Sequence, residues 1–483
     1  MSDPVSSTGR SGRPRIVVVG GGLAGLKAAL SCAEAGAAVT LLEARPRLGG
    51  ATWSFARRGL MFDNGQHVHL RCCEAYRSLL ERLGTEALAP FDGSLAIPVL
   101  RPCRPSATRA DRATVSWIRR DDLVAPAHLA RALATYRHLG LADRMRLLPA
   151  AVGLRFARLE DPRLDTETFG SWLARHGQRP EAIERLWDLI TLPTTNLRAF
   201  EVSLALAAKV FKTGLLTDKA AADLAWSRVP LAELHVEPAR RLLESLGTEI
   251  HLRAKVSELV LGGAGPTEPP RVRGVVADGQ ILEAEAVILA VPHEVAAGLL
   301  PEAAHPAPGS LVELGSVPIV NVHLVFDRKV MPYAVAAAVD SPVQFVFDRT
   351  AAAGLDPSQP GQVVAISLSG ADGEIGTRPE QLIEEQLEAF RVLFPSARSA
   401  EVVDAVVSRE HDATFRGLPG TRPLRARPET GISNLALAGA WTDTGWPATM
   451  EGAVRSGAAA ADVVLRAIGH RGHTSNRHEE VVA

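Results

Sequence analysis

The sequence has few aromatic residues, a net charge close to zero and no long apolar run. Aromatic residues make up 5% of the 483 positions, and three of them are tyrosines. The net charge is -1 at pH 7, so no overall field favours a nucleic-acid partner. No stretch of about 18 apolar residues occurs, which excludes an ordinary transmembrane helix.

Cysteine is also scarce. The four cysteines, Cys32, Cys72, Cys73 and Cys103, form no CxxC pair and have no metal-ligand spacing. We therefore expect no metal site and a reduced, cytoplasmic compartment. Both ends are polar, and residues 1–14 lack the apolar core of a signal peptide. We expect a disordered lead-in over 1–14, a disordered tail over 470–483 and no export.

Residues 15–51 have the pattern of a dinucleotide-binding βαβ unit. A β-branched apolar run leads directly into Gly20, Gly22 and Gly25, spaced as GxGxxG. The first glycine permits a tight turn, and the second lets the backbone approach a diphosphate. The third lets a helix that opens at about Leu23 and Ala24 pack closely on the strand.

A second predicted strand, residues 38–42, ends at Glu43, where a carboxylate can accept ribose hydroxyls. This acid favours FAD or NAD over NADP. A glycine pair follows, and EARPRLGGA resembles the FAD signature of the glutathione-reductase-like flavoproteins, specifically the amine oxidase and phytoene desaturase superfamily. The resemblance implies FAD contacts at Glu43, Ala44, Arg45, Gly49 and Gly50. The family's usual arginine after the pair is Ala51 here, so we expect Arg45 or Arg47 to replace that phosphate contact.

A second glycine-rich segment lies near the end of the chain. A strand over 435–438 leads to Gly439, and a helix opens at 447–450 with its N-terminal N–H groups free to stabilise an anionic reduced flavin. The segment resembles the C-terminal flavin motif of the same superfamily. That resemblance implies cofactor contacts at Gly439, Ala440, Thr449, Met450 and Glu451. The family's usual aspartate is Ala440 here, and Asp443 is the nearest acid.

The segment DNGQH, Asp63 to His67, combines turn-forming residues with a histidine. An ordinary polar hairpin explains it, but it also resembles the corresponding segment of the hydroxysqualene dehydroxylases. DSPVQFVFDR, residues 340–349, resembles the same family. We expect the turn to lie beside the reactive ring, with Asp63 or His67 supplying a proton as a catalytic residue.

Residues from about 98 to 229 are predicted to be mostly helical, with a break at Pro193. Arginine is frequent there, which indicates either a face that lies on an anionic membrane or a solvated helical cap over the substrate. Strand-like runs follow from residue 249, at 317–349 and at 402–409, with a helix between 378 and 394. Asp278-Gly279 marks a hairpin turn, and Val256 falls where the family places a backbone contact to adenine.

These observations predict an α/β fold: a glutathione-reductase-like Rossmann FAD-binding domain with a discontinuous α+β substrate-binding domain. We assign residues 15–97, 235–305 and 420–469 to the first and residues 98–234 and 306–419 to the second. The resemblance to the squalene-associated FAD-dependent desaturases extends from Ile16 to Leu465.

The resemblance implies reduction of hydroxysqualene, a polyprenoid, to squalene in hopanoid biosynthesis, with FAD as cofactor. It also suggests contact with prenyltransferase-like enzymes of the squalene pathway and peripheral attachment at the inner face of the membrane. Three alternatives stay open: a carotenoid or phytoene-type desaturase, an amine oxidase, and a non-catalytic flavin-binding partner in a squalene-synthesis complex. The scarcity of aromatic residues disfavours the amine oxidase, which needs an aromatic cage.

Overall fold

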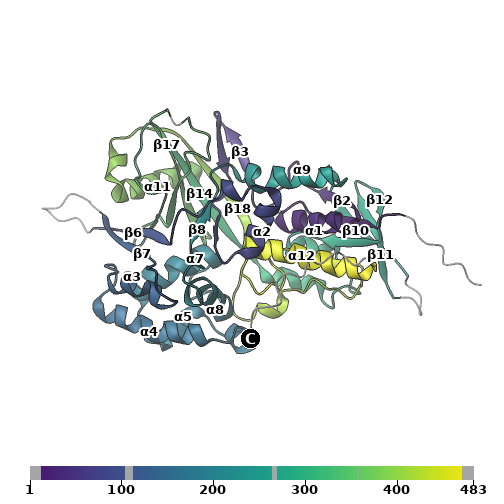
Figure 1. Ribbon diagram of the computed structural model, residues 1–483, viewed down its shortest axis with the longest axis horizontal. Helices are drawn as coiled ribbons and strands as arrows, with labels where there is room; N and C mark the ends of the chain where they lie inside the picture. The colour runs from purple at the N-terminus through teal and green to yellow at the C-terminus, as the bar shows by residue number, and fades with distance from the viewer. Residues whose placement is uncertain (1–11, 104–112, 264–268, 357, 470–483) are drawn as a thin grey trace, which may run out of the picture.

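The computed structural model describes residues 12–103, 113–263, 269–356 and 358–469, which Figure 1 shows as ribbons. The predicted disorder of residues 1–11 and 470–483 lies outside the described residues. Arg13 and Pro14 do not fit the predicted lead-in. The Arg13 Nε donates to the Gly36 carbonyl at 3.0 Å, and the Pro14 carbonyl accepts from the Ala38 N–H at 2.9 Å. These two residues therefore belong with the first sheet.

A parallel five-stranded sheet occupies the right half of Figure 1. Ile16 and Val18 pack among the residues of the helices on one face, whereas Val17 and Val19 pack with the core of the other face. This period of two explains why the first strand is continuously apolar. The order is β19 (Leu435–Leu437), β13 (Ala286–Leu289), β1 (Arg15–Val19), β2 (Ala38–Glu43) and β9 (Glu249–Leu252).

The helices α1 (Leu23–Glu34), α9 (Glu237–Ser245) and α12 (Met450–Ala467) supply that first face. The other face carries an antiparallel sheet of β10 (Val256–Gly262), β11 (Arg271–Ala277) and β12 (Gln280–Glu283). Asp278 and Gly279 both have positive φ, at 50° and 76°, and connect β11 to β12. The predicted hairpin turn is confirmed, since a two-residue turn of this type requires positive φ at both positions.

A mixed seven-stranded sheet occupies the upper left of Figure 1, where α11 (Pro379–Leu393) packs on it through Leu382 and Phe390. Its long strand β14, second from the β18 edge, pairs antiparallel with both neighbours. The predicted strands and helix of this region are confirmed, and the strand predicted at 402–409 extends to Phe415. The order is β18 (Val402–Phe415), β14 (Ser316–Phe326), β17 (Gln362–Ser369), β16 (Phe345–Asp348), β15 (Val335–Ala338), β6 (Ala96–Pro102) and β7 (Ala113–Arg119).

A helical layer lies below that sheet in Figure 1. It consists of η2 (Ala127–Leu129), α3 (Ala130–Ala134), α4 (Leu141–Phe156), η3 (Pro162–Asp165), α5 (Phe169–Arg175), α6 (Pro180–Ala182), η4 (Ile183–Trp187), α7 (Asp188–Thr195), α8 (Leu204–Phe211) and η5 (Lys212–Leu216).

Two expectations for this region are wrong. The hairpin of β6 and β7 occupies the first part of the segment predicted to be helical, and its strands complete the edge of the seven-stranded sheet. Pro193 lies inside α7 and does not break it. The helix continues past Pro193, which removes only its own N–H donor, and ends at Asn196, where φ is 61°.

The remaining elements are short. They are β3 (Ser54–Arg57), β4 (Leu60–Asp63), β5 (Val68–Leu70), α2 (Glu74–Leu83), η1 (Glu86–Leu88), β8 (Leu224–Trp226), η6 (Ala232–Val236), α10 (His293–Leu299), η7 (Pro308–Leu314), η8 (Pro395–Arg398) and η9 (Arg422–Leu424). Among the described residues, no helix is long and apolar enough to cross a membrane. The division into two domains stays a prediction, and its boundaries at residues 97 and 234 need moving because they cut β6 and η6.

Gly457 sets the distance between α1 and α12. A Cβ built at Gly457 would lie 2.2 Å from the Ala24 carbonyl oxygen, whereas a Cβ at Gly298 of α10 would meet nothing within 4 Å. We expect Gly457→Ala to lower the free energy of unfolding by about 1–3 kcal/mol through overpacking. Gly298→Ala, the matched control, should leave it unchanged or raise it by about 0.5–1 kcal/mol. Urea unfolding measures both, and equal effects would contradict the steric argument.

Candidate active site

The two glycine motifs of the N-terminal segment form one backbone cradle. The Gly49 N–H donates to the Gly21 carbonyl at 2.9 Å, and Gly22 forms a parallel bridge with Gly49. A Cβ at Gly50, where φ is 57°, would lie 2.9 Å from the Cα of Gly22. The cradle stands at the N-terminus of α1, which begins at Leu23 and Ala24, so backbone N–H groups and the helix dipole favour an anion such as a diphosphate there.

Glu43 ends β2 beside this cradle, as the sequence predicted. Its Oε2 accepts from the Gly21 N–H at 2.6 Å, and its Oε1 accepts from the Arg45 N–H at 2.7 Å. The residue is buried. An ionised carboxylate has about four acceptor positions, so two remain for hydroxyl groups such as those of a ribose. The residues present therefore fit FAD.

Arg45 and Arg47 converge on the same carbonyl. Each places an Nη1 atom 3.4 Å from the Gly50 oxygen, and the Arg47 guanidinium lies 3.9 Å from the centre of the Trp53 ring. Burial lowers the pKa of Arg47, and the neighbouring Arg45 charge lowers it further. Two cations held this close favour an anion between them. This arrangement supports the prediction that one of them replaces the arginine absent at Ala51.

The C-terminal segment is organised by Arg425, which the sequence analysis missed. Its buried guanidinium donates to the carbonyls of Trp441 at 3.2 Å, Thr442 at 2.5 Å and Trp446 at 2.8 Å, and it reaches the Ala440 carbonyl at 3.4 Å. Burial lowers the pKa of Arg425 to about 10, so the side chain stays charged at neutral pH. A cation thus lies behind the backbone at the position where the family carries an acid.

Helix α12 begins directly after this loop. The Thr449 Oγ1 accepts from the Gly452 N–H at 3.2 Å as the N-cap, and Met450 opens the first turn. Only glycine fits at position 439, because φ is 146° and a Cβ there would lie 2.5 Å from the Trp441 Nε1. Val256 is buried at the start of β10, paired with Ala277, and Ala44 follows β2.

The Glu451 side chain contacts the start of α2. Its carboxylate is buried and accepts from the Ala75 N–H at 3.1 Å, from the Tyr76 N–H at 2.8 Å and from the Arg455 Nε at 2.6 Å. The side chain therefore caps the N-terminus of α2. These contacts give the side chain a structural role, and its predicted cofactor contact stays a prediction.

Asp63 forms a buried ion pair with Arg349. The two side chains are 4% and 8% exposed, and the Arg349 Nη2 donates to the Asp63 Oδ2 at 2.7 Å. The Asp63 Oδ1 accepts from the Ser54 Oγ at 2.6 Å and from the Leu231 N–H at 2.9 Å. Three donors, one of them the Arg349 cation, therefore hold this carboxylate in place. These contacts position Asp63, and its predicted part in proton supply stays a prediction.

His67 lies close to this ion pair. Burial lowers its pKa below the ordinary value, and the charge of Arg349 also lowers it, while Asp63 and Glu410 raise it. Gly65 gives the ring room, because a Cβ there would lie 3.3 Å from the His67 Nε2. Asp63 and His67 thus lie at the two ends of the segment between β4 and β5, and their expected position beside the reactive ring stays a prediction.

A second buried histidine, His235, was not foreseen. The Thr52 Oγ1 donates to the Gly49 carbonyl at 2.9 Å, so it must accept from the His235 Nε2 at 2.9 Å. The His235 Nδ1 then accepts from the Tyr76 hydroxyl at 3.1 Å. Burial lowers the pKa of His235 to about 3, which agrees with a neutral ring. The chain of hydrogen bonds ties the glycine pair to α2.

Asn64 connects the cradle to the seven-stranded sheet. Its Nδ2 donates to the Ala51 carbonyl at 2.8 Å and to the Glu410 Oε1 at 2.9 Å, and its Oδ1 accepts from the Trp53 N–H at 2.9 Å. The Asn64 carbonyl accepts from the Ser408 hydroxyl at 2.8 Å. No group of three or more potential metal-ligating side chains is found in the part of the chain that the structure describes.

A glycine cradle at a helix N-terminus, an acid at the end of the second strand and a capped C-terminal helix define a flavin-dependent oxidoreductase. The chain belongs to the family of flavin containing amine oxidoreductases, which it matches over residues 23–465. FAD is its cofactor.

Three relatives match nearly the whole chain. Hydroxysqualene dehydroxylases of Sinorhizobium fredii and Rhodopseudomonas palustris are each 29% identical to this chain, over 93% of it and over 97% and 98% of their own lengths. The 15-cis-phytoene desaturase of Glycine max is 25% identical over 96% of this chain and 82% of its own.

Solved structures share the fold. An oxidoreductase from Methanosarcina mazei superposes with a TM-score of 0.68 at 17% identity, covering 92% of this chain and 98% of its own. Cyclohexylamine oxidase from Brevibacterium oxydans superposes with a TM-score of 0.65 at 18% identity, covering 95% of this chain and all of its own. The predicted α/β FAD-binding fold is confirmed.

The ion pair of Asp63 and Arg349 gives a double-mutant prediction. Asp63→Asn and Arg349→Met should each lower the free energy of unfolding by about 3–5 kcal/mol, because each leaves the other partner buried without its counter-charge or its hydrogen bond. The double variant should lose less than the sum of the two. Urea unfolding of all four proteins measures the coupling. Additive losses would show that the pair does not act as a unit.

Proposed function

We propose that this protein is an FAD-dependent oxidoreductase that reduces hydroxysqualene to squalene. The agreement with two hydroxysqualene dehydroxylases over 93% of the chain carries the proposal. The Asp63 to His67 turn, which resembles that family, lies in the structure beside the buried ion pair that joins the two halves. The substrate would gain a hydride at carbon, and its hydroxyl would take up a proton and leave as water.

The cofactor-binding residues are proposed to act as follows. Gly20, Gly22, Gly49 and Gly50, with the helix opening at Leu23 and Ala24, would hold the diphosphate of FAD. Glu43 would bind the ribose, and Arg45 would bind a phosphate oxygen beside Ala44. The Val256 backbone would meet the adenine. Gly439, Ala440, Thr449 and Met450 would bind the flavin end.

The bound FAD, when reduced, supplies the hydride. His67 is proposed to supply the proton to the departing hydroxyl oxygen, because it is the titratable side chain of the turn that is not already neutralised by an ion pair. Asp63 and Arg349 hold the turn in place, since they connect β4 to residues 227–231 and to the end of β16. The packed core around Phe62 and Val363 keeps water out on that side.

A second candidate function is a carotenoid desaturase, which would use the same cofactor in the oxidising direction. The 25% identity to 15-cis-phytoene desaturase over 96% of the chain favours it. The likeness to amine oxidases shows the fold alone.

We also propose that the protein acts in the cytoplasm, at the inner face of the membrane, and contacts squalene-pathway prenyltransferase-like enzymes.

Product analysis tests the proposed function directly. FAD-loaded protein in detergent with hydroxysqualene and dithionite should form squalene, detected by gas chromatography and mass spectrometry. The same protein with phytoene and a quinone oxidant should form no desaturated product. Desaturation of phytoene without squalene formation would overturn the proposal in favour of the desaturase.

The proton-donor role of His67 predicts a pH profile. Because the protonated ring is the active form and burial holds the pKa of His67 below about 6.5, the rate of squalene formation should rise as pH falls toward that pKa. His67→Gln should lower the rate by about 10²- to 10⁴-fold and remove this dependence while FAD stays bound. His251→Gln, at an exposed position of β9, is the control. A His67→Gln profile equal to that of the wild type would exclude this role.

A further inference from the structure

Helix α4 carries an exposed row of large apolar side chains. Leu148 and Phe156 are 67% and 75% exposed, and the row is completed by Leu141, Met145 and Val152. At 3.6 residues per turn these five positions fall within a sector of about 80° and extend for about 22 Å. Leu147, Ala150 and Leu154 lie on the opposite side of the helix and are buried in the core of the helical layer. The helix is therefore apolar on two faces, and only one of them packs on the protein.

Positive charge borders this outer row. Arg155 follows in the last turn, with its guanidinium 6.0 Å from the centre of the Phe156 ring, and Arg158 is exposed just beyond the helix. The acidic residue of the helix, Asp143, is already paired with Arg146 and Arg179. An apolar row with arginines at one end complements the surface of a bilayer that contains anionic lipids.

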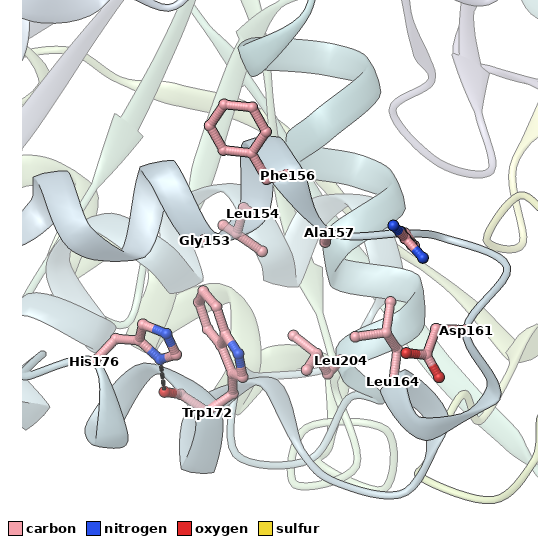
Figure 2. A pocket seen from close by; sticks show the side chains of 10 residues that line it. Gly153, Leu154, Phe156, Ala157, Asp161, Leu164, Trp172, His176 and Leu204 are labelled. Atoms are coloured by element: carbon pink, nitrogen blue, oxygen red, sulfur yellow. Dashed lines mark hydrogen bonds between the residues drawn. The ribbon is translucent and has the colours of Figure 1, made fainter.

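A cavity of about 370 Å³ opens at the same end of α4. Figure 2 shows Phe156 and Gly153 on one side of it, with Trp172 and His176 on another and Leu204 beside Trp172. Trp172 stacks on His176, with ring centres 3.8 Å apart, and Gly153 leaves room for this stack because a Cβ there would lie 2.9 Å from the Trp172 ring. Phe156 thus belongs both to the outer row and to the lining of the cavity.

We propose that the outer row of α4, from Leu141 to Phe156, is a docking face for an anionic lipid bilayer, and that the adjoining cavity opens toward the lipid. Only the purpose of the docking face, access to a substrate dissolved in the membrane, rests on the proposed function. Neither the row nor its arginines belong to the cofactor cradle.

Vesicle sedimentation tests the docking face. The holoenzyme should bind vesicles of phosphatidylglycerol and phosphatidylcholine at low salt, and should bind pure phosphatidylcholine vesicles more weakly. Met145→Asp/Leu148→Asp should reduce the partition coefficient at least about tenfold, because the two side chains no longer enter the bilayer. Arg155→Glu/Arg158→Glu should weaken binding to the anionic vesicles only. Ile281→Asp, at a position of β12 that is 64% exposed, is the matched control and should bind as the wild type does.

The outcomes separate the docking face from the catalytic proposal. Both double variants should keep the wild-type rate on hydroxysqualene in detergent and lose rate only when vesicles present the substrate. Wild-type vesicle binding by Met145→Asp/Leu148→Asp, or no vesicle binding by the wild type, would overturn the docking face. A dimer that this variant converts to a monomer would assign the face to a second copy of the chain instead. Vesicle binding without squalene formation would overturn the proposed function and leave the docking face standing.

Discussion

The close approach of glycine backbones around α1 is the constraint on which the rest of the structure depends. Gly25 packs against the Gly20 carbonyl, Gly457 packs against the Ala24 carbonyl, and Gly50 packs against Gly22; at each of these positions a Cβ would lie less than 3 Å from the neighbouring backbone. The contact of Gly457 with Ala24 brings together segments more than 400 residues apart. These backbone contacts fix the positions of the cradle, the second glycine motif and α12 relative to one another.

The parts of the fold that depend on local patterns could be predicted from the sequence. The GxGxxG turn, Glu43 at the end of its strand, the Asp278-Gly279 hairpin and the strand before Gly439 all follow from short-range backbone requirements, and the structure has each of them. The β6–β7 hairpin could not be predicted in this way, because its strands are stabilised by pairing with β15, more than 200 residues away. Pro193 was misjudged because its position relative to the helix end was unknown.

The chemistry of the site was harder to predict, because it depends on partners that are distant in sequence. Nothing near Asp63 in the chain indicates that Arg349 neutralises it, and nothing near Glu451 indicates that it caps α2. Arg425 and His235 carry no motif at all. The outer face of α4 was hidden for a different reason. A helix that is apolar on both sides shows no clear periodic contrast between apolar and polar positions. The abundance of arginine was therefore the only sequence feature that indicated a membrane face. Several of those arginines, such as Arg120 and Arg144, instead make contacts within the protein.

Asn64 has a mechanical consequence for the molecule. One amide side chain and its own carbonyl hold the segment after the glycine pair, the indole-bearing Trp53 and two residues of β18 in a single junction. A bulky molecule bound on the seven-stranded sheet could shift β18. Because Asn64 bonds both β18 and the Ala51 carbonyl, such a shift would also displace that carbonyl, one residue from the cradle. Asn64 therefore couples the position of β18 to the backbone next to the glycine cradle.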